Sequence, residues 1–133
     1  MAKISDIMKS QVVTVERGTP VMEAIQILVK HNFTGLPVVD TDNQVIGVIS
    51  EKDILSLAIR AREQSCSAEQ KDMRVEDFMT KDTVTIEATE SLTALCSCLM
   101  KNKFRRLPVV LNNKLVGIVT RRDVISYILN IQA

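Results

Sequence analysis

The sequence is poor in the residues on which several specialised classes of protein depend. Its 133 residues include no tryptophan, one tyrosine, one histidine and three cysteines. An odd number of cysteines does not build a disulfide framework, and no cluster of residues has the spacing of metal ligands. Aromatic residues make up only 3% of the chain, so few rings are present to stack on the bases of single-stranded nucleic acid. These shortages exclude a disulfide scaffold and argue against a metal centre.

Long apolar runs and a surplus of charge are also missing. No apolar run approaches the roughly 20 residues that a membrane-spanning helix needs, and the first residues, MAKISD, lack the apolar core of a signal peptide. The net charge is +1, with 46% hydrophobic and 25% charged residues, which is typical of soluble globular proteins. We therefore expect a cytoplasmic protein without membrane contacts and without a broad nucleic-acid surface.

The chain does contain an internal repeat. FTGLPVV at 33–39 returns as FRRLPVV at 104–110, and VIGVISEKDIL at 45–55 returns as LVGIVTRRDVI at 115–125. The offset is 71 residues up to Leu107 and 70 residues at Gly117, after a single deletion in a loop. Two copies predict a pseudo-symmetric pair. Because one copy of about 60 residues would be marginally stable alone, we expect the copies to pack face to face.

Each copy predicts the order strand, helix, strand, strand, helix. In the first copy we expect strands at 12–15, 36–39 and 45–49, and helices over 20–31 and 51–63. Thr19 is the expected N-cap of the first helix, with Pro20 at its first position. Cys96 and Cys98 occupy positions where the first copy has isoleucines, so we expect them to pack in the interior. Short helical turns are expected before each first strand, at 5–8 and 76–79.

One-sided helices combined with short apolar strands predict an α/β fold. The repeats are expected to span residues 1–63 and 75–133, joined by a polar linker at 64–74. This linker is weakly patterned and predicts neither a helix nor a strand.

Each copy carries a hydroxyl residue followed three positions later by an aspartate, where a strand meets a helix. In the first interpretation, Ser50 and Thr120 are helix N-caps, and Asp53 and Asp123 are the acidic residues that suit the first helical turn. In the second, the same helix N-termini bind a ligand. Unpaired backbone N–H groups favour a phosphate, the hydroxyl can donate to a phosphate oxygen, and the carboxylate can accept hydrogen bonds from a ribose diol.

The doubled pattern, Leu-Pro-Val-Val followed by Gly, two apolar residues, Ser or Thr, and Asp three positions later, resembles a tandem pair of CBS domains, or Bateman module. The resemblance covers essentially the whole chain. It implies two β-α-β-β-α repeats packed sheet to sheet about a pseudo-twofold axis. It also implies a regulatory protein, with AMP, ADP, ATP or sometimes S-adenosylmethionine held in clefts between the repeats. No obligatory cofactor is implied, and signalling would pass through a homodimer or a separate effector protein.

The resemblance also assigns candidate binding residues. Asp53 and Asp123 match the carboxylate that binds ribose, and Ser50 and Thr120 match the hydroxyl that contacts phosphate. The remaining matches are the basic phosphate contacts Arg105, Arg106 and Arg122, and the main chain near Val12 and Thr83, which meets adenine.

The two copies differ in charge. The second has Arg-Arg at 105–106 and 121–122, where the first has Thr-Gly and Glu-Lys. We therefore expect a polyphosphate to be held mainly by side chains of the second copy, whichever copy supplies the ribose contact. The alternatives are that these arginines form a solvated face, or that the module binds no ligand and only dimerises or docks a partner.

Two other classes of function have less support in the sequence. Binding of nucleic acid through these basic residues lacks the necessary aromatic side chains. An enzyme would need an activated nucleophile or a metal cluster, and neither pattern is present. The one histidine, His31, ends the first predicted helix, where a positive charge is favourable.

Overall fold

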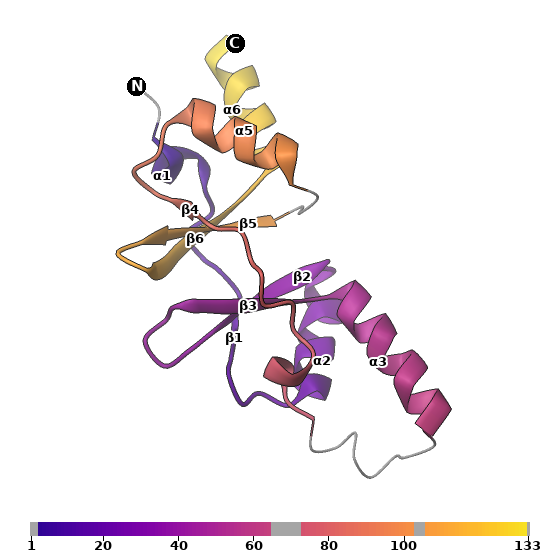
Figure 1. Ribbon diagram of the computed structural model, residues 1–133. Helices are drawn as coiled ribbons and strands as arrows, with labels where there is room; N and C mark the ends of the chain where they lie inside the picture. Colours follow the sequence, from indigo (N-terminus) through magenta and orange to yellow (C-terminus); the bar gives the residue numbers. More distant parts are fainter. Residues whose placement is uncertain (1–2, 65–72, 103–105, 133) are drawn as a thin grey trace. The chain divides into compact units, whose positions relative to one another are not determined.

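The computed structural model describes residues 3–64, 73–102 and 106–132. The chain divides into two compact units (Figure 1). One, called here the Asp53 unit, is Val13–Thr83, and the other, the Asp123 unit, combines Met1–Val12 with Val84–Ala133. Each unit thus contains the sheet and main helices of one repeat together with the leading segment of the other repeat.

The predicted order of elements is confirmed in both repeats. The Asp53 unit contains β1 (Val15–Glu16), α2 (Val21–His31), β2 (Gly35–Val39), β3 (Val45–Ser50), α3 (Glu51–Gln64) and the short η1 (Val75–Asp77). The Asp123 unit contains α1 (Ile4–Ile7), β4 (Ile86–Glu87), α5 (Leu92–Lys101), β5 (Arg106–Leu111), β6 (Lys114–Thr120) and α6 (Arg121–Gln132).

Several predicted element boundaries differ from the observed ones by one to three residues. These include the predicted turns at 5–8 and 76–79, which are observed at Ile4–Ile7 and Val75–Asp77. Strand β1 begins at Val15, not at Val12. Helix α2 begins at Val21, with Pro20 as its N-cap residue in an extended conformation and without a side-chain cap. The N–H of Val21 instead donates to the carbonyl of Met73, so a distant segment satisfies a donor at this helix end. The predicted cap at Thr19 therefore lies one residue too early.

The described residues form two three-stranded sheets with the same topology. In each sheet the first strand pairs in parallel with the second, and the second pairs antiparallel with the third. Both central strands have a register shift at the same repeat position, between Val38 and Val39 and between Val109 and Val110. The α/β fold expected from the repeat is therefore confirmed, and the two sheets also share an irregularity that the sequence did not predict.

The hairpin turns follow from asparagine and aspartate. Asn112 and Asn113 have φ of 53° and 66° between β5 and β6, which is the backbone of a tight two-residue turn that suits the strand twist. The β2–β3 loop is longer, and Oδ1 of Asp40 accepts hydrogen bonds from the backbone N–H groups of Asp42 and Gln44, each at 2.9 Å. The single deletion in the second copy therefore falls in the β5–β6 turn, which is the shorter of the two.

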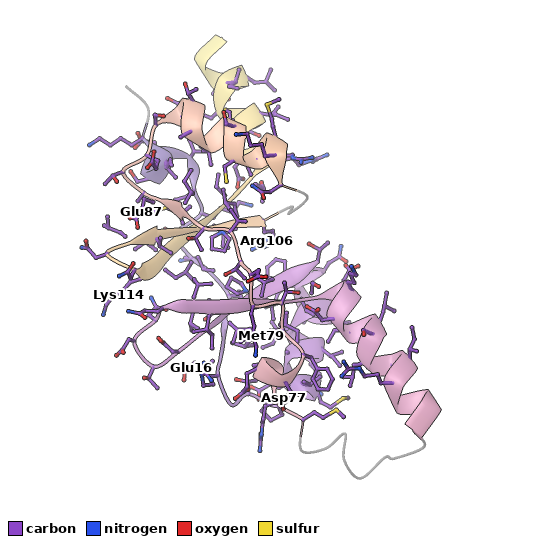
Figure 2. All side chains as sticks on the ribbon, in the orientation of Figure 1. Glu16, Asp77, Met79, Glu87, Arg106 and Lys114 are labelled. Carbon is purple, nitrogen blue, oxygen red and sulfur yellow. The ribbon has the colours of Figure 1, made fainter. Side chains whose placement is uncertain are left out.

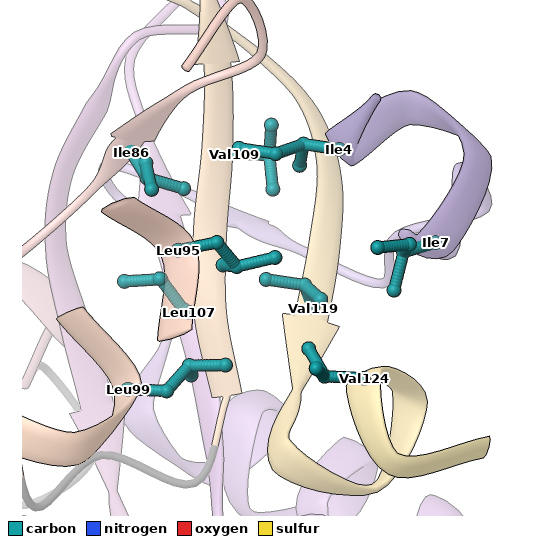
Figure 3. Packing of buried hydrophobic residues seen from close by; sticks show 9 residues of the cluster. All are labelled: Ile4, Ile7, Ile86, Leu95, Leu99, Leu107, Val109, Val119 and Val124. Atoms are coloured by element: carbon teal, nitrogen blue, oxygen red, sulfur yellow. The ribbon is translucent and has the colours of Figure 1, made fainter. Parts of the chain in front are cut away.

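Each unit has its own apolar core on one face of its sheet. In the Asp123 unit the helices α1, α5 and α6 cover the same face of β5 and β6 (Figures 1 and 3). Its cluster consists of Ile4, Ile7, Ile86, Leu95, Leu99, Leu107, Val109, Val119 and Val124. The half-buried Cys96 and Cys98 pack against it, as expected from the isoleucines they replace. The core of the Asp53 unit is built from Val15, Ala24, Leu28, Leu36, Val38, Ile49 and Val75.

A crossing segment lies tightly against the third strand of each sheet. Val48 and Thr80 exchange two backbone hydrogen bonds of 3.0 and 2.9 Å, and Lys9 and Ile118 exchange two of 2.8 and 2.9 Å. A Cβ added to Gly47 would lie 2.5 Å from the sulfur of Met79 and 2.9 Å from the carbonyl of Thr80. Figure 2 labels Met79. Glycine is therefore required here by the close approach of another chain segment.

None of the helices in the described ranges combines the length and the apolar character that crossing a bilayer requires.

Candidate functional site

Each hydroxyl residue of the doubled motif caps the helix that follows it. The backbone N–H and the hydroxyl of Ser50 both donate to Oδ2 of Asp53, at 2.8 and 2.9 Å. In the second repeat the N–H of Thr120 donates to Oδ2 of Asp123 at 2.9 Å, and the N–H of Asp123 donates to Oγ1 of Thr120 at 3.1 Å. The capping interpretation is therefore confirmed, and it fixes one oxygen of each carboxylate.

The other carboxylate oxygen receives at most one long hydrogen bond from the described residues in either repeat. Oδ1 of Asp53 accepts from the hydroxyl of Thr80 at 3.3 Å, which is longer than the usual 2.5–3.0 Å of such bonds. The structure shows no hydrogen bond from the described residues to Oδ1 of Asp123. Each half-buried aspartate thus has one oxygen that holds the helix and one that can accept a hydrogen bond from a ligand.

Arg106 lies beside the hydroxyl–aspartate pair of the second repeat, Thr120 and Asp123. Arg106, labelled in Figure 2, is the first residue of β5. It pairs directly with Thr120 of β6. Burial lowers the pKa of the Arg106 guanidinium, and the negative charge of Asp123 opposes that shift. We call Arg106, Thr120 and Asp123 the Asp123 cluster. We call Ser50, Asp53 and Thr80 the Asp53 cluster. In the first repeat, Gly35 occupies the strand position that pairs with Ser50, and it provides no side chain.

The sequences and solved structures of other proteins identify the family. A family profile for the CBS domain matches residues 4–60 and 75–130. The chain belongs to the CBS domain family. Both clusters lie within the matched ranges, so each CBS repeat contributes the strand and helix that carry one aspartate.

Two solved CBS-pair structures resemble the whole chain. The crystal structure of CBSX2 from Arabidopsis thaliana, in complex with AMP, is 32% identical, covers all of both chains and has a TM-score of 0.84. The CBS domain pair of protein MJ0100, in complex with 5′-methylthioadenosine and S-adenosyl-L-methionine, is 28% identical with a TM-score of 0.73, over 100% of this chain and 99% of that one.

Other relatives differ in length. The chain is 33% identical over 130 residues to a 17.7 kDa protein of Acidianus ambivalens, covering 97% of this chain and 74% of that protein. It is 32% identical over 123 residues to protein MJ1225 of Methanocaldococcus jannaschii, covering 92% of this chain and 41% of that protein. The chain thus spans less than half of MJ1225.

Arg121 has a different role from the one its position in the Arg-Arg pair suggests. Its guanidinium donates to the carbonyl of Leu99 at 3.1 and 2.9 Å and to the carbonyl of Asn102 at 3.0 Å. These carbonyls lie at the C-terminus of α5, where positive charge is favourable. In the first CBS repeat, α2 ends instead on Asn32 with φ of 55°. The charge of Arg121 is therefore used to complete a helix.

The remaining predicted site residues divide between the units. Thr83 belongs to the Asp53 unit and lies three residues after Thr80, whereas Val12 belongs to the Asp123 unit and lies three residues after Lys9. Arg122 is exposed in the first turn of α6. Arg105 lies outside the described residues.

Thr80 is the site residue that the sequence did not identify. Its contact with Asp53 spans 27 positions, so no local pattern could reveal it. The repeat offers one signal, because Thr80 follows the methionine that aligns with Met8, and both methionine segments cross a glycine of the doubled motif.

No metal centre is present among the described residues, since no three histidine, cysteine, aspartate or glutamate side chains come close enough to share an ion. His31 ends α2 as expected, and its ring stacks on that of Phe33 with the centroids 5.0 Å apart.

An apolar groove of about 360 Å³ lies between α2 and α3 of the first CBS repeat. It is lined by Ile25, Leu28, Val29, Asn32, Phe33, Glu51, Ile54 and Leu55. None of the Asp53 cluster contributes to this lining, so the groove is a separate feature.

Proposed function

We propose that this protein is a regulatory module that binds an adenosine-containing ligand, namely AMP, ADP or ATP. The observation that carries the proposal is the repeated carboxylate with one oxygen fixed by a helix N-terminus and the other open to a ligand. The complexes of CBSX2 with AMP and of MJ0100 with 5′-methylthioadenosine and S-adenosyl-L-methionine support it.

Each part of the ligand has proposed contacts. Oδ1 of Asp53 or Asp123 accepts hydrogen bonds from the ribose diol. The hydroxyl of Thr120 and the guanidinium of Arg106 bind phosphate, with added positive charge from Arg105 and Arg122. Backbone groups near Val12 and Thr83 meet adenine. The helix N-terminus contributes favourable partial charge for an anion.

Binding alone does not signal, so the ligand must favour one state of the module over another. We expect that state to be a geometry of a homodimer. The helices of both CBS repeats expose large apolar side chains at equivalent positions, in the pairs Val29/Met100, Leu55/Ile125 and Ile59/Leu129. Because the pattern occurs twice, a second copy related by a twofold axis presents the same apolar surface in return.

The test of ligand binding is a thermal-shift experiment with AMP, ADP, ATP, S-adenosylmethionine and 5′-methylthioadenosine. A ligand at about 100 times its dissociation constant stabilises the folded state by about 2.7 kcal/mol, which raises the Tm by several degrees at this size. We expect at least one adenine nucleotide to produce that shift. An unchanged Tm with all five compounds would refute the proposal.

The matched controls are aspartate variants. Asp53→Ala combined with Asp123→Ala removes both ribose acceptors and should abolish the shift. Asp40→Ala removes an aspartate that also accepts backbone hydrogen bonds but belongs to the β2–β3 loop and to neither cluster, and it should leave the shift intact.

A further inference from the structure

The two clusters share a plan but use their hydroxyl groups differently. The hydroxyl of Ser50 donates its hydrogen to Oδ2 of Asp53 at 2.9 Å. Oγ1 of Thr120 accepts from the N–H of Asp123 at 3.1 Å, as Oγ of Ser50 accepts from the N–H of Asp53 at 3.4 Å, but the Thr120 hydroxyl donates its own hydrogen to no described residue. A hydroxyl carries one hydrogen. Thr120 can therefore donate to a ligand oxygen, whereas Ser50 has already committed its donor.

The residues across the sheet also differ. Arg106 pairs with Thr120 and brings a guanidinium to the Asp123 cluster, whereas Gly35 pairs with Ser50 and brings no side chain. A Cβ at Gly35 would lie 3.3 Å from both the carbonyl of Ile49 and a methyl group of Val48, so even a small side chain fits tightly. The first repeat thus lacks the cation that the second repeat has at this position.

The crossing segments and the first turns of α3 and α6 also differ in charge between the two repeats. The segment against β6 carries the exposed Lys9, where the segment against β3 carries Thr80. Lys52 and Arg122 occupy equivalent positions and are both basic and exposed, so this position adds the same positive charge to each repeat. The first turn of α3 contains Glu51 in addition to Asp53, and a phosphate with its charge of about −2 would meet both carboxylates there.

We propose that the two clusters bind ligands of different charge. The Asp123 cluster takes a nucleoside 5′-phosphate, and the Asp53 cluster takes a nucleoside whose 5′ substituent carries no phosphate. This inference rests on the proposed function and assigns a ligand class to each repeat. The module can then hold one ligand of each class at the same time.

The test follows two amide signals in the NMR spectrum of the full-length ¹⁵N-labelled protein. The N–H groups of Ser50 and Thr120 each donate to the aspartate of their own cluster, so each reports binding at one cluster. Adenosine and AMP are titrated separately. We expect the Thr120 signal to respond to AMP at a concentration about tenfold lower than to adenosine, and the Ser50 signal to respond to adenosine at least as readily as to AMP.

Arg106→Met tests the source of the preference. It should weaken AMP binding at Thr120 about tenfold, as the loss of one charge-assisted hydrogen bond does, without changing the adenosine response at Ser50. Lys114→Met removes a positive charge from the exposed end of the β5–β6 hairpin in the same unit and should change neither response.

The outcomes separate the two levels of the proposal. Equal ratios of AMP to adenosine affinity at Ser50 and Thr120 in the unmodified protein would overturn the ligand classes while leaving adenosine-ligand binding intact. An effect of Arg106→Met no larger than that of Lys114→Met would also overturn them. Failure of both compounds to move either signal would overturn this inference, whereas the proposed function falls only if the thermal-shift experiment is also negative with all five of its compounds.

Discussion

Gly47 and Gly117 show how single residues determine where a segment can cross a sheet. Both glycines lie where a methionine-containing segment passes over a strand, and the residue after each glycine exchanges two backbone hydrogen bonds with that segment. The structure shows that both glycines of the doubled motif are places of close approach to another segment. The identity of the approaching segment could not be predicted, because Met79 and Met8 are far from these glycines in the sequence.

At this scale we predict that Gly117→Ala destabilises the protein by about 1–3 kcal/mol, the usual cost of overpacking. The added Cβ would overlap the side chain of Met8 and lie 3.1 Å from the carbonyl of Lys9. Urea unfolding measures the change. In the double variant with Met8→Ala, the loss should be smaller than the sum of the two single losses, because the shortened side chain makes room. Simple additivity would contradict this explanation.

The C-termini of α2 and α5, the equivalent helices of the two repeats, are capped in different ways. Helix α2 ends on a left-handed Asn32, whereas α5 ends on an extended Asn102 and relies on the guanidinium of Arg121. The periodic apolar residues made the helices themselves predictable. The guanidinium contact was not, since it joins residues 22 positions apart and since the sequence placed Arg121 beside the presumed phosphate contacts.

Arg121→Ala should therefore lower the free energy of unfolding by about 1–2 kcal/mol through the loss of charge-assisted hydrogen bonds at an exposed helix end. Its affinity for AMP, measured by calorimetry below the unfolding temperature, should stay within about twofold of that of the unmodified protein. Arg121→Lys should recover only part of the stability, because an ammonium group cannot reproduce the bidentate contact with Leu99. Unchanged stability with lost AMP binding would instead identify Arg121 as a phosphate contact.

For the molecule as a whole, the repeat predicted the fold far better than it predicted how the chain is partitioned. Strand and helix order follow from local patterns that occur twice. The partition depends on which repeat the segments 3–12 and 73–83 pack against, and the sequence of each segment is equally compatible with either. In the structure, backbone hydrogen bonds between Lys9 and Ile118 and between Thr80 and Val48 join each leading segment to the sheet of the other repeat. The Asp53 cluster exists only because of this arrangement, since Thr80 enters from the second repeat's leading segment.

The proposed homodimer can also be tested on the whole molecule. If the exposed apolar helix faces form a homodimer, light scattering coupled to size-exclusion chromatography should give twice the mass of one chain. Leu55→Glu with Ile125→Glu places charges at equivalent positions of both repeats and should yield a folded monomer. Leu111→Glu alters an exposed apolar residue outside the helices and should leave the dimer intact. A monomeric unmodified protein would contradict the dimer.

The exchanged leading segments have a practical consequence for dividing the chain. A fragment that contains one complete sequence repeat, such as 75–133, would lack Ile4 and Ile7 from its core and would leave Gly117 without the strand-like segment that covers it. It would also carry the segment 75–83, whose packing surface remains on the other fragment. The natural points for dissecting this protein are therefore the peptide bonds after Val12 and Thr83, not the linker between its repeats.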